Sequence, residues 1–256
     1  CLASVDPNGD PTTGINRVST TGGQLFGFFG PQDDAKSAST GGADPWPTDQ
    51  YLNIWVCDLL PILLGYAQFP GDDPTTDGVV IGFNYFGNIG TVTAPYNKGR
   101  TTSHEVGHWL GLRHIWGDGS SCTATDYCGD TPPSDAPNYG CATTHSSCSG
   151  PDMVQNYMDY SAETCQNSFT EGQVLLMHGV LEGPRYDLVY GNPATVNELD
   201  FANWNVYPNP TQGTVTVRSD IEIDQVRVMD ISGKEVLTKT LQGSQTTLEL
   251  SYLGSG

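Results

Sequence analysis

Three of the five histidines fall within one stretch of eleven residues that also holds a glutamate and two glycines. His104 and His108 are four residues apart, which places both rings on one face of a helix, and Glu105 follows the first of them. Gly111 tolerates a positive φ, so the chain can turn sharply there and bring His114 towards the same point. Three neutral imidazoles leave the fourth position of a tetrahedral zinc ion open for water. The spacing therefore predicts a catalytic zinc site.

Glu105 is the one carboxylate at the offset that such a site needs for proton transfer. Zinc lowers the pKa of a bound water to about 7, and a neighbouring carboxylate can pass its proton to a leaving amine. One alternative is that the three histidines are ordinary surface or core residues of a helix. Another is a non-catalytic zinc-containing extracellular binding or adhesion protein, which would be expected to lack the glutamate or one ligand. This chain retains both the glutamate and all three histidines.

Two helices are expected around this site. The first begins with Thr101 or Thr102 as N-cap and ends at Gly111, which suits a left-handed C-terminal position. The second begins at Thr170, which has capping-box spacing to Gln173, and ends before a Gly-Pro pair. The segment between the two helices is rich in turn-forming residues and predicts loops.

Runs of β-branched and aromatic residues predict strands at 51–57 and 79–83, both largely buried. After a linker near 191–203, short alternating runs at 214–217, 226–231 and 247–250 predict a small all-β module. The chain is therefore expected to be α+β, with a larger first domain and a smaller β domain after it.

The composition narrows the function classes. The chain has 256 residues, with 29 Asp and Glu against 10 Lys and Arg and a formal net charge of -19. This charge disfavours nucleic-acid partners and anionic membrane surfaces. No apolar run approaches the roughly 18 to 20 residues of a transmembrane helix, so no membrane span is expected. Residues 1–5 resemble the end of an apolar strand, so we expect a further segment before them.

Five of the seven cysteines lie in one stretch rich in Gly, Pro, Ser and Asp: Cys122, Cys128, Cys141, Cys148 and Cys165. Such a segment favours disulfides and therefore an oxidising, extracytoplasmic environment. The competing interpretation is a structural zinc cluster, in which paired cysteines sit about two to four residues apart. Even the nearest two cysteines, Cys122 and Cys128, are farther apart than that.

The spacing of the histidines is that of the metzincin clan of zinc peptidases. Metzincins resemble one another also in a tight turn with a methionine beneath the zinc, and residues 156–160 are similar to it. The resemblance implies that Met158 forms the floor of the site and that Tyr160 approaches the zinc or the oxyanion of the transition state. The alternative for Tyr160 is a tyrosine packed at a loop corner.

Within this clan the chain most resembles the pappalysin family, including bacterial members related to ulilysin and cytophagalysin. The similarity covers nearly all of residues 1–185, in the stretches 2–17, 51–70, 77–86, 100–117, 130–132 and 152–173. It implies a metallopeptidase domain at 1–190, with a twisted sheet, an active-site helix and an irregular lower half. It also implies cleavage of proteins or peptides outside the cell. We expect a monomer.

The pappalysin resemblance implies two disulfides in the lower half, Cys122–Cys148 and Cys141–Cys165. A third bridge, Cys1–Cys57, is proposed because both residues belong to predicted strands that could lie side by side. Cys128 then has no assigned partner, and its state is left open.

The same resemblance implies calcium (Ca²⁺) in the lower half. Asp126 and Thr131 match positions that supply side-chain oxygens, and Thr123 and Gly129 would supply backbone carbonyls. The alternative is a solvated Asp-rich loop, since no EF-hand spacing is present.

Substrate preference is the point at which the sequence departs from its relatives. Some of them favour a basic residue after the cleaved bond through an aspartate that precedes a cysteine, and Thr164 stands at that position here. Glu163 is one residue further away and is predicted to reach the same pocket. The acidity of the chain would also favour cationic peptides.

The last part of the chain resembles the C-terminal sorting domain that Bacteroidetes use for type IX secretion. The similarity lies in Tyr207-Pro208-Asn209-Pro210, Gly213, residues 230–234 and residues 253–256, in that order. It implies an Ig-like β-sandwich at 204–256 that stops one strand early. It also implies contact with the secretion machinery, and a secreted or cell-surface location. The alternative is a carbohydrate-binding or adhesion module.

Overall fold

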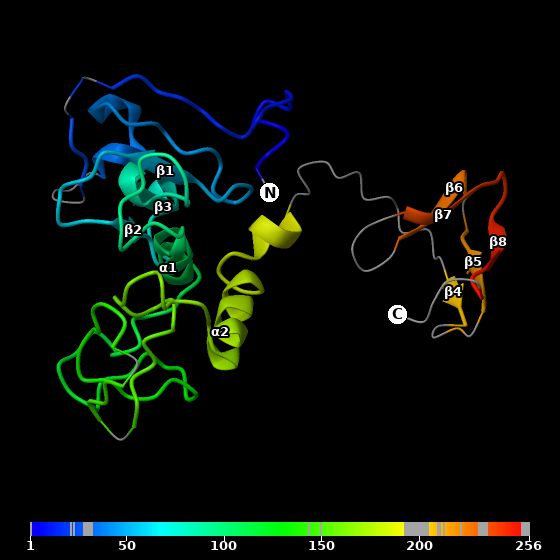
Figure 1. The fold of residues 1–256 in the computed structure, drawn as a ribbon. Coiled ribbons are helices and arrows are strands. Elements are labelled where there is room, and N and C mark those ends of the chain that lie inside the picture. Colours follow the sequence, from blue (N-terminus) through cyan, green and yellow to red (C-terminus); the bar gives the residue numbers. More distant parts are fainter. Residues whose placement is uncertain are drawn as a thin grey trace. The chain divides into compact units, whose positions relative to one another are not determined.

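The chain forms two compact units, residues 1–194 and 195–256, which are described separately (Figure 1). The structure is a computed structural model. It describes residues 2–20, 22, 24–27, 33–142, 144–148, 150–191, 205–208, 211, 213–220, 222–229 and 235–251. Cys1, Asn209, Pro210 and residues 192–204, 230–234 and 252–256 lie outside these ranges, so most of the linker and much of the sorting motif are not described. Cys57 carries a free thiol, so the expected Cys1–Cys57 bridge is wrong.

A three-stranded sheet forms the upper half of the first unit. Its strands are β1 (Ile54–Cys57), β2 (Gly65–Ala67) and β3 (Val79–Gly82), in the order β1-β3-β2. β3 is central, pairing in parallel with β1 and antiparallel with β2, and all its residues are buried. The expectation of a buried β1 is wrong, because β1 lies at an edge and alternates between exposed and half-buried residues. The short β2 was not predicted.

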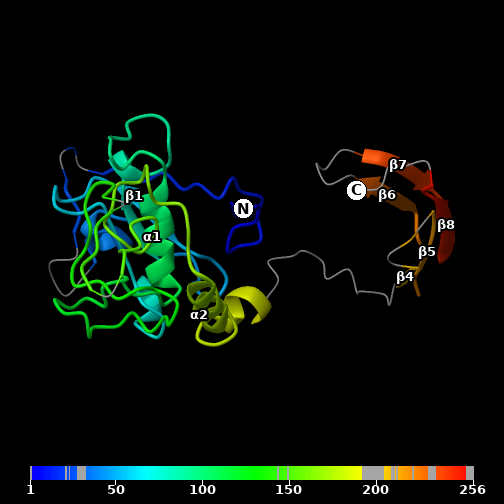
Figure 2. The ribbon, with the colours of Figure 1, turned by 60° about the horizontal axis from the view of Figure 1, so that its bottom comes forward.

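Helix α1 (Arg100–Trp109) lies beside this sheet (Figures 1 and 2). Val79, Ile81 and Trp109 form the core between the helix and the sheet. The predicted N-cap at Thr101 or Thr102 is wrong, since the helix begins at Arg100 after Gly99. Gly99 has a φ of 74° and provides no side-chain cap. The helix start is therefore stabilised from elsewhere in the chain.

Below α1 the chain is irregular, and the described residues between α1 and α2 contain neither helix nor strand. Two disulfides cross-link this lower half, Cys122–Cys148 and Cys141–Cys165, with Cα separations of 5.7 and 5.8 Å. Both are the pairings that the pappalysin resemblance implied. Cys128 is buried with a free thiol.

Helix α2 (Glu171–Leu181) closes the first unit. It begins with the predicted capping box, in which Thr170 accepts from the backbone of Gln173 and the Gln173 side chain accepts from Thr170. Asp130 of the lower half also accepts hydrogen bonds from the Thr170 hydroxyl and the Gly172 N–H, both at 2.8 Å. A π-helical turn, Asp187–Gly191, follows. Short 3₁₀ turns occur at Asp34–Lys36, Ala38–Thr40, Pro74–Thr76 and Phe83–Tyr85.

The described residues of the second unit form five short strands in two sheets. One sheet has the order β4-β5-β8 and the other is the antiparallel pair β6-β7. Val215, Val217 and Leu248 of the first sheet form a small core, against which Val226, Val228 and Leu237 of the second sheet pack. The strands are β4 (Asn205–Tyr207), β5 (Thr214–Arg218), β6 (Gln225–Met229), β7 (Glu235–Thr240) and β8 (Gln245–Glu249), of which β4 and β7 were not predicted.

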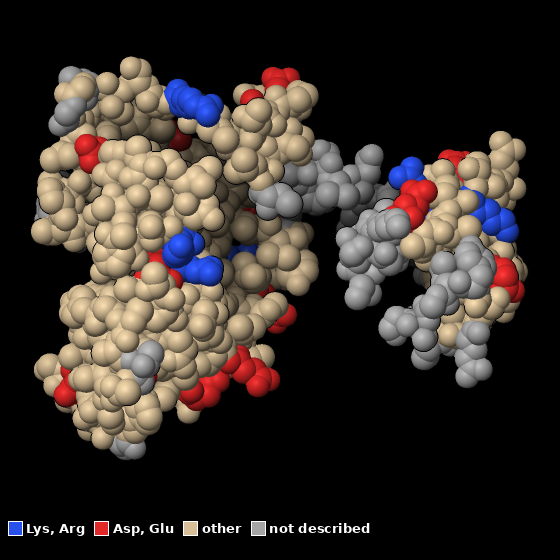
Figure 3. Space-filling model, viewed as in Figure 1, with Lys and Arg blue, Asp and Glu red and all other residues tan. Residues whose placement is uncertain are grey.

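Acidic side chains are visible at several separate places on the face of the first unit shown in Figure 3, among few basic ones. Over the part of the chain that the structure describes, helices are too short or too polar to cross a membrane.

Candidate active site

The three histidines of the motif meet at one point beside α1. His104 and His108 come from successive turns of the helix, and His114 comes from the loop after it. Their Nε2 atoms lie 3.1 Å apart for His104 and His108, 3.2 Å for His104 and His114, and 3.0 Å for His108 and His114. Within the described ranges they form the one group of at least three His, Cys, Asp or Glu side chains suited to a metal ion.

Glycines explain how the chain brings these rings together. The helix ends at Trp109, and Gly111 just after it has a φ of 88°, in the left-handed region. The Leu112 N–H then donates to the Gly107 carbonyl at 2.9 Å. This turn places the Leu112 carbonyl against Nδ1 of His108, at 2.8 Å. The chain then runs on to His114, as the position of Gly111 in the sequence predicted.

The outer nitrogen of each ring has an acceptor. Nδ1 of His104 faces the Tyr157 carbonyl at 2.6 Å, Nδ1 of His108 faces the Leu112 carbonyl, and Nδ1 of His114 faces the carboxylate of Asp118. Carbonyl and carboxylate oxygens only accept, so the proton of each neutral ring lies on Nδ1. The three Nε2 lone pairs therefore point at one another and cannot hydrogen-bond among themselves.

This donor set fits a zinc ion. Zinc bonds of about 2.0–2.1 Å hold tetrahedral nitrogen ligands about 3.3–3.4 Å apart, close to the spacing observed here. Burial lowers the pKa of His104, as do His108 and His114, and burial and His114 lower that of His108 to about 4. Burial also lowers the pKa of His114. The rings are thus neutral at neutral pH, the form that binds metal.

Glu105 lies next to this cluster on the inner side of α1. Its side chain packs against strand β2, where a Cβ added to Gly65 would lie 2.9 Å from Cγ of Glu105. Burial raises the pKa of Glu105 to about 8. A cation beside the carboxylate favours its ionised form, so a bound metal would lower the pKa of Glu105 from this value.

Met158 packs against α1, and Tyr160 lies beside two of the three histidines. Met158 is fully buried beneath the helix, and a Cβ added to Gly107 would lie 2.5 Å from its sulfur atom. The Tyr160 ring stands at 4.8 Å from that of His114 and at 5.8 Å from that of His104, measured between centroids. Burial, followed by Glu105 and Asp118, raises the pKa of Tyr160 to about 12.

Glu163 and Thr164 occupy different environments. Glu163 is 2% exposed, and its carboxylate accepts from the N–H groups of Lys98 and Thr101 and from the Thr101 hydroxyl. Its oxygens are thus directed at the start of α1. Thr164 is exposed, and its hydroxyl lies 3.2 Å from Sγ of Cys141.

The predicted calcium ligands are brought together only in part. The Thr131 hydroxyl lies 2.9 and 2.8 Å from the two oxygens of Asp126 and 2.7 Å from the Cys128 carbonyl. A hydroxyl has one proton, so these three acceptors exceed what it can satisfy. Thr123 and Gly129 are exposed, and the Thr123 hydroxyl pairs with that of Ser121 at 3.0 Å.

Sequence reasoning missed Trp116 and Asp118, which both contact His114. The Trp116 ring stacks on that of His114 with centroids 4.2 Å apart and planes at 7°. The signal was a carboxylate four residues after the third histidine, directly following a glycine.

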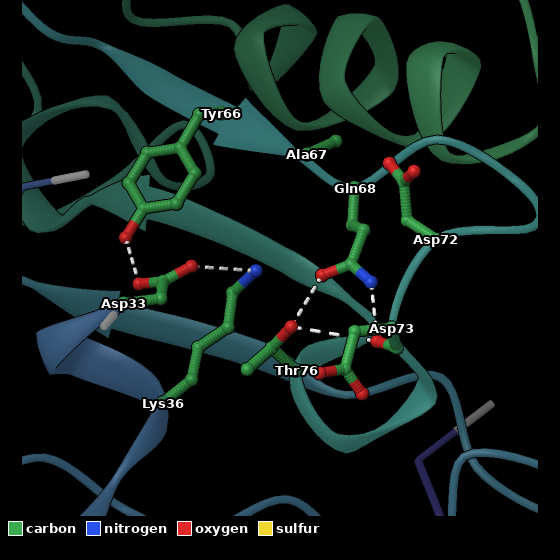
Figure 4. Close-up of a pocket in the computed structure, with 8 residues that line it drawn as sticks. All are labelled: Asp33, Lys36, Tyr66, Ala67, Gln68, Asp72, Asp73 and Thr76. Atoms are coloured by element: carbon green, nitrogen blue, oxygen red, sulfur yellow. Dashed lines mark hydrogen bonds and ion pairs between the residues drawn. The ribbon is translucent and has the colours of Figure 1, made fainter. Parts of the chain in front are cut away.

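A separate pocket of about 580 Å³ opens on the face of the sheet opposite α1. Figure 4 shows Ala67 directed towards the helix and Tyr66 directed away from it, towards Asp33 and Lys36. Lys36 pairs with Asp33 at 2.8 Å, and Tyr66 donates a hydrogen bond to the same carboxylate. The polar groups of this pocket thus largely satisfy one another.

Comparison with known proteins agrees with this geometry. Residues 37–182 match the sequence model of a peptidase family described as pregnancy-associated plasma protein-A. The chain belongs to this family. The pappalysin resemblance is thereby confirmed, and the chain is a member of a metallopeptidase family.

Solved structures support the same assignment. The structure titled Tannerella forsythia mature mirolysin in complex with a cleaved peptide is 46% identical, covers 75% of both chains and superposes with a TM-score of 0.70. Mirolysin in complex with compound 9 is 47% identical, covers 76% of both chains and has a TM-score of 0.69. The first unit therefore has a metzincin-like peptidase fold.

Fungal relatives match a shorter part of the chain. Extracellular metalloproteases of Arthroderma otae and Coccidioides posadasii are 41% and 43% identical over 134 and 131 residues, which is 48% of this chain in each case. These matches cover 47% and 46% of the fungal proteins, so the chain spans about half the length of these relatives.

The second unit has its own family. Residues 205–256 match the model described as a secretion system C-terminal sorting domain. The chain is thus a secreted or cell-surface protein, as its resemblance to type IX sorting domains implied.

Proposed function

We propose that this pappalysin-family chain is a secreted zinc-dependent endopeptidase that hydrolyses peptide bonds in proteins or peptides. The observation that carries the proposal is the convergence of three Nε2 lone pairs at 3.0–3.2 Å, beside Glu105 and Tyr160. His104, His108 and His114 would hold the metal. When bound, zinc supplies Lewis-acid activation of water and of the scissile carbonyl.

The chain's own residues then have distinct roles. Glu105 takes a proton from the attacking water and delivers it to the leaving amine. Tyr160 keeps its hydroxyl proton at neutral pH because its pKa is raised to about 12, so it donates a hydrogen bond to the oxyanion that develops on the substrate. Met158, buried against the helix at Gly107, would form the floor of the site.

The substitution Glu105→Gln tests the catalytic assignment. We expect zinc affinity, measured by chelator competition, to persist while cleavage of a mixed peptide library falls by roughly 10²- to 10⁴-fold or more. Glu182→Gln, at an exposed residue after α2, is the matched control and should cleave like the parent chain. Retained proteolysis by Glu105→Gln would refute the assignment.

The alternative function is a non-catalytic zinc-containing extracellular binding or adhesion protein. It predicts zinc binding by the parent chain without cleavage of any peptide in the library. The presence of Glu105 in the buried site favours the endopeptidase.

A preference for basic residues after the cleaved bond is a weaker proposal. The acidic surface would attract cationic peptides, and the exposed Thr164 carries no charge to select them. The Glu163 carboxylate would have to leave its three donors in order to contribute. A cleavage profile of the parent chain without basic preference would reject this proposal.

Calcium is proposed as a structural ion at the cluster of Asp126, Thr131 and the Cys128 carbonyl. The backbone carbonyls of Thr123 and Gly129 are proposed as further ligands. The excess of acceptor oxygens around the Thr131 hydroxyl supports a hard cation there. Added calcium should raise the unfolding temperature of the parent chain and leave that of Asp126→Asn unchanged. An equal rise in the unfolding temperature of both chains would show that calcium binds at another site.

The proposed domain organisation is a catalytic domain at 1–190, a linker at 191–203 and a sorting domain at 204–256 that engages the secretion machinery. The two compact units and the two family matches support boundaries close to these. Packing of β6 and β7 residues on the core of the other sheet supports an Ig-like sandwich. Limited proteolysis should cut within 191–203, and light scattering should show a monomer.

A further inference from the structure

His114 differs from the other two histidines in what orients its ring. Nδ1 of His104 and Nδ1 of His108 donate to backbone carbonyls, whereas Nδ1 of His114 donates to the side chain of Asp118. The hydrogen bond at Nδ1 of the third ring is therefore made to one replaceable side chain.

A tight turn brings that carboxylate back to the ring. The Gly117 N–H donates to the His114 carbonyl at 2.8 Å, and Gly117 and Asp118 both have left-handed backbones, with φ of 66° and 57°. A Cβ on Gly117 would overlap the backbone of Ala124 and Thr125, so glycine is required there. A non-glycine residue seldom adopts a positive φ without a reason, and asparagine and aspartate tolerate it best.

The turn holds the ring from two directions. The stacked Trp116 ring fixes the plane of the imidazole, and the hydrogen bond to Asp118 fixes the rotation of the ring within that plane. Asp118 has no other hydrogen-bond partner among the described residues, and its side chain is 46% exposed. The Asp118 side chain therefore contributes little to the stability of the core.

We propose that Asp118 is a positioning residue of the metal site, which keeps the proton of His114 on Nδ1 and directs Nε2 at the ion. A carboxylate in this place also makes the imidazole a stronger ligand than a backbone carbonyl does, because it carries a full charge. The proposal rests on the proposed zinc site and adds to it a side chain that does not touch the metal.

Zinc affinity of the purified chain tests this, without reference to activity. The chain is stripped of metal and titrated with zinc against a chromophoric chelator, as the parent and as Asp118→Asn, Asp118→Gly and Asp49→Asn. Glycine accepts the left-handed backbone and removes only the carboxylate, so we expect Asp118→Gly to lose roughly 10- to 100-fold in zinc affinity. Asparagine can still accept the hydrogen bond, so its loss should be smaller. Asp49→Asn removes one exposed charge elsewhere and should bind like the parent.

Two measurements separate the possible failures. If the metal-free parent chain takes up no zinc, the proposed function fails at the metal site itself. If the parent binds zinc and Asp118→Gly binds within about twofold of it, only the role of Asp118 is overturned. The urea midpoints of the metal-free parent and Asp118→Gly should coincide. A lower midpoint for Asp118→Gly would assign Asp118 to the fold and overturn the proposal.

Discussion

The carboxylate of Glu163 accepts a hydrogen bond from the backbone N–H of Thr101 at 2.6 Å and so caps the helix that carries the active-site histidines. The N-cap residue, Gly99, has no side chain to do this. The same carboxylate accepts from the Thr101 hydroxyl at 2.7 Å and from the Lys98 N–H. A negative charge at a helix N-terminus also interacts favourably with the helix dipole. The loop after Met158 thus fixes the start of α1.

Replacing Glu163 with glutamine should therefore destabilise the fold. The amide group turns a donor towards an N–H that needs an acceptor, at a cost of about 1–3 kcal/mol in the free energy of unfolding. The measurement is urea unfolding of the metal-free chain. Cleavage by the folded variant should keep its sequence preference, because the carboxylate serves the helix. Thr164→Ala is the control, because it changes the adjacent exposed residue. A sequence preference that changes in Glu163→Gln but not in Thr164→Ala would show that Glu163 contributes to the substrate pocket.

Gly107 and Gly179 give opposite predictions for the same substitution. An added methyl at Gly107 would meet the sulfur of Met158 at 2.5 Å, so Gly107→Ala should cost about 1–3 kcal/mol in stability and weaken zinc binding. At Gly179, in α2, nothing lies within 4 Å of the added carbon. Gly179→Ala should raise stability by up to about 1 kcal/mol through helix propensity. Thermal unfolding of both variants checks the pair, and a stabilising Gly107→Ala would contradict the close packing of Met158 against Gly107.

Asp159 predicts a dependence of stability on pH. Burial raises its pKa from 3.8 to about 6, although the N–H groups of Asn138 and Tyr160 act in the other direction. The folded chain therefore holds this proton more tightly than the unfolded chain, and the resulting stability is complete below pH 3.8 and is lost as the pH rises through about 6. Asparagine has no proton to lose at this position.

The stability of Asp159→Asn relative to the parent should consequently increase across this window, by up to about 3 kcal/mol. Urea unfolding of both chains at several pH values between about 4 and 7 measures the difference, in which other titrating groups cancel. Stability curves that stay parallel would show that Asp159 is ionised in the folded chain throughout.

Arg185 forms a buried ion pair at the far end of α1. Its guanidinium contacts both oxygens of Asp77, its Nε donates to the Trp109 carbonyl at 3.0 Å, and it lies 3.9 Å from the Trp109 ring. Arg185→Met leaves the Asp77 charge buried with only the Trp109 N–H beside it, so we expect a loss of about 3–5 kcal/mol. Adding Asp77→Asn removes that charge, and the double variant should lose less than the sum of the two single losses. Additive losses in urea unfolding would show that the pair is not coupled.

The features that the sequence predicted correctly are those that depend on residues close together in the chain. The spacing of the histidines, the turn at Gly111 and the capping box of α2 each lie within eleven residues or fewer. The two disulfides of the lower half followed from resemblance to a family.

The errors arose where the partner is distant in the sequence. Glu163 caps Thr101 from 62 residues away, and no local pattern signals such a contact. The burial of β1 depended on its place at the edge of the sheet, and β2 is too short for a periodic pattern. Asp118 was missed because its role depends on a left-handed backbone that its residue type only permits.

The Cys141–Cys165 bridge has a consequence for where the protein matures. Cys165 lies two residues beyond Glu163, so the bridge tethers the segment that holds the start of α1. Disulfides persist in oxidising compartments and are kept reduced in the cytoplasm. The tether is therefore expected to close once the chain has left the cytoplasm, and a chain still in the cytoplasm lacks a cross-link beside the start of its histidine helix.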